Sequence, residues 1–374
     1  MNIPKWPISS SREIELLRRV LDSPQWGGFH EIVGEFEQSF AAYQHCAHGI
    51  GVFNGTVSLE MMLEVCGIGP GDEVIIPAIS FVSTATAVSR VGAIPVFVDI
   101  EPYSFNIDPR CVEEAVGPRT KAILAVHFGG PMCEIERLAS IATDRNLILF
   151  EDAAHAQGSE WNGRRAGSFG LAASFSFQNG KVMTSGEGGM VTTNDDAFAE
   201  KCRAFANQGR DLKQPGATFF HHYTLGSNFR LTALQAAVLM AQFERVDQQI
   251  ALRCRNESFL REKLSRVPGL TFQKVPVEVN RHSHYLLSGR IDADAFGETR
   301  DAFHCRMTAA GVPCTPFYPH TLYQNPLYSS GNAPSRVLPC PISEACVLDA
   351  FWFPHRALMS EPETIEAIAR EIAP

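Results

Sequence analysis

The sequence predicts an α/β protein: a large doubly wound domain with a mostly parallel sheet, followed by a smaller α+β C-terminal domain. From about residue 50, short apolar runs alternate with helical periods, as expected when helices cover both faces of a parallel sheet. The runs are rich in β-branched and apolar residues, which is typical of strands buried on both faces. A long helical pattern at 228–264 contains no Gly or Pro and could link two domains. We therefore predict domains at 1–245 and 246–374.

The expected elements follow in order along the chain. Two helices, at 11–21 and 34–43, precede the sheet. Strands of the large domain are predicted at 73–77, 94–100, 121–128, 147–152, 174–177 and 189–193. Helices are predicted at 57–66, before the first of these strands, and between them at 81–91 and 134–145. Beyond the long helix we expect strands at 286–291 and 312–316 and a closing helix at 361–372.

Composition narrows the class of protein. With 45% hydrophobic and 20% charged residues, the chain of 374 residues is typical of a globular protein. Its net charge of −9 argues against nucleic acid, and the absence of basic runs argues against an acidic membrane surface. No signal peptide or membrane-spanning stretch is recognisable in the sequence. The ten scattered cysteines lack a C-x-x-C pair and indicate reduced thiols, so we expect a cytoplasmic protein.

One lysine stands in an unusual setting. A short run of Ser and Phe at 174–177 leads to Lys181, and a glycine-rich turn follows at 186–189. An amine fixed in this way suits a Schiff base with an aldehyde cofactor. Upstream, Asp152 ends the apolar run 147–152. A lysine and an aspartate, each at a strand end, form the pair that pyridoxal phosphate requires: an amine for the aldehyde and a carboxylate for the pyridinium. We take both residues as catalytic.

Two places on the chain could hold the cofactor phosphate. Gly55 and Thr56 lie before the first strong helix of the α/β domain, where free N–H groups and the helix dipole attract an anion. A simple helix cap by Asn54 or Thr56 is the competing interpretation. Ser176 lies five residues before the lysine, and its hydroxyl could bond the same phosphate. A bond from this serine to the backbone is equally compatible with the sequence.

Three further side chains could contact the cofactor ring. Phe81 could stack on the pyridine, although most phenylalanines belong to the core. His155, three residues after the strand end, could donate to the phenolic oxygen, although a lone histidine is more often structural. A buried Asp152 would keep the ring nitrogen protonated and make the ring an electron sink, but an aspartate here could also cap a helix. No metal-ligand set can be assembled from the spacing of the residues.

Taken together, four segments resemble the StrS/DegT-type family of pyridoxal-phosphate aminotransferases, which act on keto sugars and cyclitols. The segments are 54–56, 151–156, 174–189 and 226–231, and the resemblance runs from about Trp26 to the C-terminus. It implies the aspartate-aminotransferase-like fold, called fold type I. It also implies a homodimer with active sites at the subunit interface.

The resemblance assigns roles to all the candidate residues except Phe81 and adds Asn228. Lys181 would be the Schiff-base lysine, Asp152 would bind the pyridine nitrogen, and His155 would lie near the phenolic oxygen. Gly55, Thr56 and Ser176 would hold the phosphate, and Asn228 would reach the phosphate in the partner's site. Family dehydratases carry histidine at the lysine position, so Lys181 favours amino transfer.

The resemblance also suggests a reaction. L-Glutamine or L-glutamate would give its amino group to a ring ketone of a keto sugar nucleotide or a cyclitol, in antibiotic or other secondary-metabolite biosynthesis. His284, Tyr285, Tyr318, His320 and Tyr323 are candidates to face that ring. Residues 177–181 and 283–285 are closer to the 3-amino-5-hydroxybenzoate synthase branch, whereas 317–327 are closer to the sugar and cyclitol enzymes. A dehydratase and aromatase of that branch, and a catalytically idle cofactor-binding regulator or partner subunit, are the alternatives.

Overall fold

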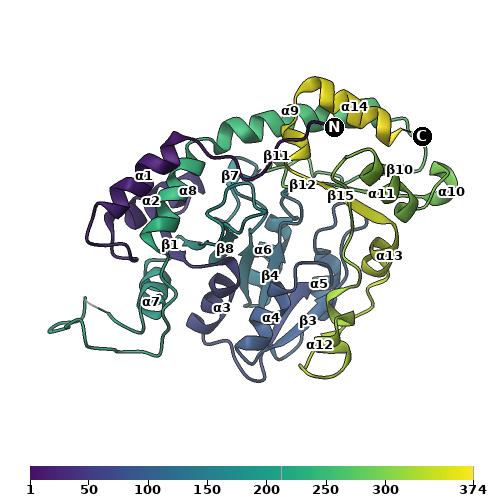
Figure 1. Cartoon of the computed structure of the whole chain (residues 1–374). Coiled ribbons are helices and arrows are strands. Elements are labelled where there is room, and N and C mark those ends of the chain that lie inside the picture. The colour runs from purple at the N-terminus through teal and green to yellow at the C-terminus, as the bar shows by residue number, and fades with distance from the viewer. Residues whose placement is uncertain (212, 374) are drawn as a thin grey trace.

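The computed structural model describes residues 1–211 and 213–373, and its centre is an eight-stranded sheet (Figure 1). All strands of this sheet run in one direction except β9, which is antiparallel to both of its neighbours. The strand order is β1 (His48–Val52), β9 (Gly189–Thr193), β8 (Ala172–Ser176), β5 (Ile148–Asp152), β4 (Thr120–Val126), β2 (Glu73–Pro77), β3 (Ile94–Val98) and β14 (Arg336–Val337). The predicted, mostly parallel sheet is therefore confirmed.

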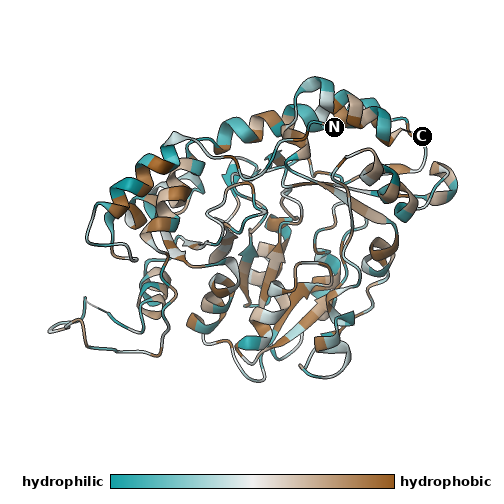
Figure 2. Cartoon of the chain, viewed as in Figure 1, coloured by the Kyte–Doolittle hydropathy of each residue, from teal (hydrophilic) through white to brown (hydrophobic). Residues whose placement is uncertain are grey.

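Helices cover both faces of the large sheet, and each face has its own apolar core. One core packs against α1 (Ser11–Leu21), α2 (Glu31–Tyr43), α5 (Pro109–Ala115), α6 (Ile135–Asp144) and α8 (Ala233–Phe243). The other packs against α3 (Gly55–Val65), α4 (Ser83–Arg90) and α7 (Asp196–Ala206). Figure 2 shows the apolar residues along the strands that these helices enclose. Burial on both faces of the sheet explains why the strand segments are continuous apolar runs in the sequence.

A second sheet follows in the C-terminal part. Its antiparallel order is β10 (Leu270–Phe272), β12 (Leu286–Ile291), β15 (Ala350–Pro354) and β13 (Thr315–Pro316). It shares an apolar core with α9 (Val246–Leu264), α10 (Ala293–Phe296), α11 (Arg300–Ala309) and α14 (Pro362–Ile372). Between β13 and β15 the chain returns to the large sheet. There α12 (Pro326–Ser329) packs against its core and β14 joins its edge, and α13 (Pro341–Asp349) then leads into β15. The domain boundary at residue 245 stays a prediction.

A small third sheet ties the two parts of the chain together. Its strand β11 (Val279–Arg281) pairs with β6 (Glu160–Trp161), which pairs in turn with β7 (Arg164–Arg165). The strand from the C-terminal part thereby lies close to the segment that follows β5. This arrangement brings the residues after β11 toward the end of β5.

The single long helix predicted at 228–264 is wrong. The structure has two helices, α8 and α9, and residues 228–232 lie outside both. Thr232 caps α8, and its bonds with Gln235 form a capping box. Residues 244–245 form a turn between the two helices, and α9 then continues toward the C-terminal sheet (Figure 1). The two helices therefore bury their apolar residues in different cores.

Within the described ranges, none of the helices combines the length and the apolar character needed to cross a membrane. All ten cysteines are free thiols, and most of them are buried. The cytoplasmic location expected from the sequence stays a prediction.

Candidate active site

A cavity of about 570 Å³ lies where several strands of the large sheet end. Strands β5 and β8 are parallel neighbours in register, with Asp152 paired to Ser174, so their ends meet at one edge of the sheet. The N-terminus of α3 and the loop between β2 and α4 complete this edge. Seven of the eight residues predicted for the site line the cavity: Gly55, Thr56, Phe81, Asp152, His155, Ser176 and Lys181. Sequence reasoning thus located one continuous site.

Lys181 is held by the turn that follows β8. Its backbone N–H donates to the Gln178 carbonyl at 2.9 Å, and the Gly180 N–H donates to the Gln178 side chain at 2.7 Å. The Lys181 Nζ lies 4.8 Å from the centre of the Tyr285 ring. Burial lowers the pKa of Lys181 to about 8, although the nearby Asp152 carboxylate acts in the other direction. The amine therefore has a substantial neutral, nucleophilic fraction near neutral pH.

Asp152 is buried at the end of β5. Its Oδ2 accepts from the Thr84 hydroxyl at 2.8 Å, and its Oδ1 accepts from the Ala154 N–H at 3.3 Å. Burial raises the pKa of Asp152, and the bond from Thr84 and the charge of Lys181 oppose that shift. The described residues just after Asp152 form turns and no helix, so the competing role as a helix cap is not seen. The carboxylate is positioned instead to meet a cationic group in the cavity.

A buried network behind Asp152 fixes β5 in place. The neighbouring Glu151 accepts from His127 Nε2 at 3.0 Å and from the Gly167 N–H at 2.8 Å. His127 Nδ1 accepts from the Cys133 N–H at 3.3 Å, so the hydrogen of the ring is on Nε2, which donates to Glu151. This buried hydrogen-bond network adds a rigid support to the end of the strand.

The start of α3 forms an anion cradle with the end of β8. Asn54 caps the helix by accepting from the Val57 N–H at 3.0 Å, so the predicted cap is real and involves Asn54. A Cβ on Gly55 would lie only 2.8 Å from the Ser176 Cβ, so this approach needs glycine. The Thr56 hydroxyl lies 2.8 Å from the Ser83 hydroxyl. The start of α3 and the hydroxyls of Thr56, Ser83 and Ser176 therefore line the same cavity, which suits a phosphate dianion.

His155 can donate a hydrogen bond into the cavity while uncharged. Its Nδ1 accepts from the Gly129 N–H at 3.3 Å, so in the neutral ring the hydrogen is on Nε2. Burial and the charge of Lys181 hold the pKa of His155 well below its usual value. The ring packs against Tyr285, with centroids 4.3 Å apart and ring planes tilted by 30°. These contacts fix both the tautomer and the orientation of the imidazole.

Two predicted residues are exposed for different reasons. The Phe81 side chain is 58% exposed and lines the cavity, so it does not belong to the core and is free to stack on a flat ligand. Asn228 is also exposed, but it lies outside the cavity of its own chain and forms a strand-like bridge with Asn207. Asn228 is therefore the one predicted site residue that the structure does not bring to the others.

The C-terminal part supplies the remaining wall of the cavity. Tyr285 and Tyr318 line it as expected, together with Trp352. The other residues predicted to face the substrate lie elsewhere: His284 approaches Glu257, His320 contacts the Thr321 carbonyl, and the Tyr323 hydroxyl donates to Glu344 at 2.7 Å. Sequence reasoning missed Ser83, Thr84 and Trp352. The hydroxyl pair at 83–84, two residues after Phe81, was a signal in the sequence for two of them.

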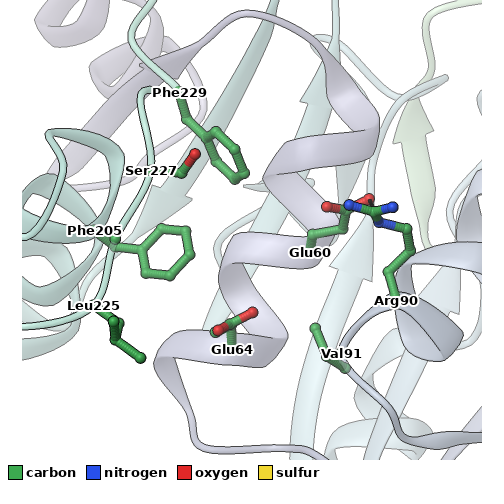
Figure 3. Close-up of a pocket in the computed structure, with 9 residues that line it drawn as sticks. Glu60, Glu64, Arg90, Val91, Phe205, Leu225, Ser227 and Phe229 are labelled. Atoms are coloured by element: carbon green, nitrogen blue, oxygen red, sulfur yellow. Dashed lines mark ion pairs between the residues drawn. The ribbon is translucent and has the colours of Figure 1, made fainter.

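A second hollow, of about 250 Å³, lies on the surface between α3, α7 and the segment 225–229 (Figure 3). Its charged groups are Glu60, Glu64 and Arg90, and Arg90 forms an ion pair of 3.4 Å with Glu60. The hollow presents no buried nucleophile or base of the kind found around Lys181. The larger cavity is therefore the candidate active site.

Comparison with known proteins identifies the family. The sequence pattern of the DegT/DnrJ/EryC1/StrS aminotransferase family matches residues 7–373, and the chain belongs to this family. It is a pyridoxal-phosphate-dependent aminotransferase, so the enzyme class and the cofactor expected from the sequence are confirmed. The cradle at Gly55, the buried Asp152 and the Nε2 donor of His155 fit the phosphate, the ring nitrogen and the phenolic oxygen of that cofactor.

Three relatives show how the chain compares within the family. It is 39% identical to a 3-amino-5-hydroxybenzoate synthase of Amycolatopsis mediterranei, covering 99% of this chain and 97% of that protein. It is 34% identical to an L-glutamine:2-deoxy-scyllo-inosose aminotransferase of Streptoalloteichus tenebrarius, covering 99% and 93%. A crystal structure of 3-amino-5-hydroxybenzoic acid synthase superposes with a TM-score of 0.92 at 36% identity, covering 99% and 97%. Fold type I is thereby confirmed.

Proposed function

We propose that this aminotransferase moves an amino group from L-glutamine or L-glutamate to a ring ketone of a cyclitol or a keto sugar nucleotide. The observation that carries the proposal is the single cavity that joins the cofactor-side residues to an aromatic wall. Lys181, Asp152 and His155 lie on one part of it, and Tyr285, Tyr318 and Trp352 come from the C-terminal part. The similarity to an aminotransferase named for L-glutamine and 2-deoxy-scyllo-inosose supports both the donor and the acceptor class.

Each residue of the cavity has a distinct role in the proposed reaction. Pyridoxal phosphate supplies an electron sink for negative charge at the reacting carbon. Lys181 attaches the cofactor, and its freed amine then carries the proton at the donor Cα as general base and acid. Asp152 keeps the ring nitrogen protonated, and His155 donates through Nε2 to the phenolic oxygen. Gly55, Thr56 and Ser176 hold the phosphate, while Phe81 covers the ring.

We further propose that the protein is a homodimer and that Asn228 binds the phosphate in the partner's site. Asn228 is exposed and lies outside the cavity of its own chain. The described part of the segment that follows α7 projects from the body of the molecule (Figure 1). It carries exposed apolar side chains, of which Phe220 is 82% and Leu225 is 91% exposed. An apolar projection of this kind supports an interface with a second copy.

The aromatic wall supports a hydroxylated ring as the acceptor. Burial raises the pKa of Tyr285 to about 12, so its hydroxyl stays protonated and can donate as well as accept. A ring hydroxyl left without a partner in a closed site costs roughly 1–3 kcal/mol, so such groups select for polyhydroxylated rings. The similarity to 3-amino-5-hydroxybenzoate synthase supports a second candidate, a dehydratase and aromatase that uses the same lysine for proton abstraction.

The donor half of the reaction provides the test. The holoenzyme is mixed with L-glutamine, L-glutamate or L-alanine, and the visible absorbance of the bound cofactor is followed. We expect glutamine or glutamate to convert the cofactor to its amine form within a single turnover, with the matching 2-oxo acid as product. The Lys181→Ala variant is the control and should show no such turnover. If the spectrum stays unchanged with every donor, the proposal is refuted, and the protein would instead be a catalytically idle cofactor-binding regulator or partner subunit.

A further inference from the structure

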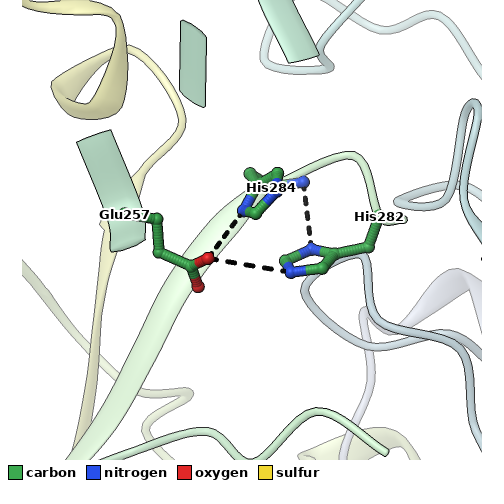
Figure 4. A group of neighbouring side chains, drawn as sticks. All are labelled: Glu257, His282 and His284. Atoms are coloured by element: carbon green, nitrogen blue, oxygen red, sulfur yellow. Dashed lines mark hydrogen bonds and ion pairs between the residues drawn. The ribbon is translucent and has the colours of Figure 1, made fainter. Parts of the chain in front are cut away.

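A buried cluster of titratable side chains lies outside the active-site cavity. Glu257 of α9 lies beside His282 and His284, which follow β11, and one nitrogen or oxygen atom of each lies within 4.8 Å of the others (Figure 4). His282 Nδ1 accepts from the His284 N–H at 3.2 Å, so in the neutral ring the hydrogen is on Nε2. This Nε2 faces Glu257 Oε2 at 3.8 Å and has no lone pair to offer a metal ion. The cluster therefore suits a charge pair and not a cation.

The contacts define a buried ion pair between α9 and the segment that follows β11. His284 Nδ1 lies 3.0 Å from Glu257 Oε2, and Glu257 Oε1 accepts from Arg261 at 2.8 and 3.0 Å. Burial would raise the pKa of Glu257, but His284 and Arg261 hold it well below its usual range. Burial would lower the pKa of His284, but neighbouring groups, Glu257 among them, raise it. Separating such a pair leaves an uncompensated buried charge, so the pair holds the two segments together.

The backbone at His284 directs the next side chain toward the active site. Its φ of 53° lies in the left-handed region, which residues other than glycine seldom adopt. The preceding Ser283 is fixed, because its N–H donates to Ser159 Oγ at 3.1 Å and its carbonyl accepts from Arg253 Nε at 2.9 Å. The following Tyr285 donates its N–H to the Ser283 hydroxyl at 3.3 Å. His284 thus contacts α9, while Tyr285 lines the active-site cavity.

Tyr285 connects this segment to the reacting amine. The centre of its ring lies 4.8 Å from Lys181 Nζ. We propose that Glu257 and His284 are positioning residues, which hold Tyr285 against Lys181 and keep water from the amine. Neither residue is among those that line the cavity, so both act only through Tyr285. The role rests on the proposed function, in which the Lys181 amine carries the proton.

The protonation of Lys181 reports the position of Tyr285 without any turnover. Reductive methylation of the full-length apoprotein is followed as a function of pH, and the Lys181 peptide is quantified by mass spectrometry. The midpoint, about 8 in the unmodified protein, should rise by about one pH unit or more in Glu257→Gln and His284→Asn, because water stabilises the charged amine. Asparagine suits position 284, since it tolerates the left-handed backbone.

The direction of the shift in Glu257→Gln separates positioning from a simple charge effect. Loss of a negative charge alone would lower the pKa of Lys181, whereas displacement of Tyr285 should raise it. A downward shift would therefore overturn the proposal.

Variants of Tyr285 show whether the ion pair acts through this ring. Tyr285→Phe keeps the aromatic contact and should leave the midpoint near that of the unmodified protein, whereas Tyr285→Ala should raise it. In the Tyr285→Ala background, Glu257→Gln should add no further shift, because the side chain that it positions is already absent. Additive shifts would overturn the proposal.

Glu298→Gln is the matched control, because it breaks another ion pair of the C-terminal part, in which Glu298 accepts from Arg306 Nε at 2.9 Å. Its midpoint should not move. In the holoenzyme, the pH at which the donor half-reaction accelerates should rise in Glu257→Gln by the same amount as the methylation midpoint.

An unchanged midpoint in a folded Glu257→Gln or His284→Asn protein would overturn the positioning role. If neither variant folds, an unchanged midpoint in Tyr285→Ala would overturn it as well. Absence of turnover with every donor would instead refute the proposed function, and the methylation result would still decide the positioning role.

Discussion

The Nζ of Lys181 lies 4.8 Å from the centre of the Tyr285 ring, and the same ring packs against His155 with centroids 4.3 Å apart. The backbone holds Tyr285 firmly, because its N–H donates to the Ser283 hydroxyl and its carbonyl accepts from the His355 N–H. One aromatic side chain from the C-terminal part thus contacts two cofactor-side residues of the large sheet. This contact excludes water from the amine and contributes to the burial that shifts its pKa.

The lowered pKa of Lys181, about 8, predicts how its reactivity depends on pH. The neutral amine gains population as pH rises through 8, well below the ordinary value for lysine, so reductive methylation of the apoprotein should follow that midpoint. Peptide mapping of the methylated lysines measures this, with the exposed Lys121 as a reference. Because the Asp152 carboxylate raises the pKa of Lys181, Asp152→Asn should move the midpoint to lower pH. A midpoint near 10.5 would contradict the burial argument.

Asp152→Asn should keep the cofactor attached but lower turnover by on the order of a hundredfold or more. A neutral amide cannot hold the proton on the ring nitrogen, so charge at the reacting carbon loses its stabilisation. Steady-state kinetics and bound-cofactor absorbance are measured together, with the exposed Asp196→Asn as a surface control. Turnover of Asp152→Asn at the wild-type rate would mean that Asp152 is only structural.

Gly55→Ala should weaken cofactor binding by about tenfold or more, because the added Cβ would lie 2.8 Å from Ser176 Cβ and force the phosphate cradle apart. Gly34 in α2 is a matched control, since a Cβ there meets no atom within 4 Å. Titration of each apoprotein with pyridoxal phosphate gives the affinities, and circular dichroism checks the fold. Equal cofactor affinities of the two variants would show that phosphate binding does not need the close contact between Gly55 and Ser176.

Mixed subunits test the shared active site. Lys181→Ala and Asn228→Ala proteins should each be impaired, but their one-to-one mixture should recover about a quarter of wild-type activity, because half of the dimers are hybrids with one intact site. Activity is measured after reversible dissociation and reassociation, with each variant treated alone as control. A monomer by sedimentation, or a mixture no more active than its components, would contradict the homodimer.

The sequence predicted the cofactor side of the site because each of its residues belongs to a local pattern. Asp152 ends the apolar run that forms β5, Lys181 follows the run that forms β8 by five residues, and Gly55 stands at the start of α3. Parallel strands end at one edge of a sheet, so these patterns are sufficient to bring the residues together.

The features that the sequence did not predict depend on long-range packing. Strand β1 was missed because it contains Gly49, where a Cβ would lie 2.6 Å from the Glu37 carbonyl, so packing against α2 excludes a β-branched residue there. The sequence has no Gly or Pro at the break between α8 and α9 near Arg245. The break is explained by the packing of α9 in the apolar core of the C-terminal part, which the sequence pattern does not reveal. The bond from Thr84 to Asp152 and the contact of Tyr285 with Lys181 likewise join residues that are remote in sequence.

Amination of a ketone acceptor is the most direct test of the proposed substrate class. The enzyme is loaded with pyridoxamine phosphate and offered 2-deoxy-scyllo-inosose, a nucleotide-linked 4-keto sugar, and pyruvate in parallel, and products are identified by mass after one turnover. We expect an amino cyclitol or amino sugar, with little reaction of pyruvate, since a ring with several hydroxyls pairs with the polar groups of the cavity. Rapid amination of pyruvate with no reaction on either ring ketone would contradict it.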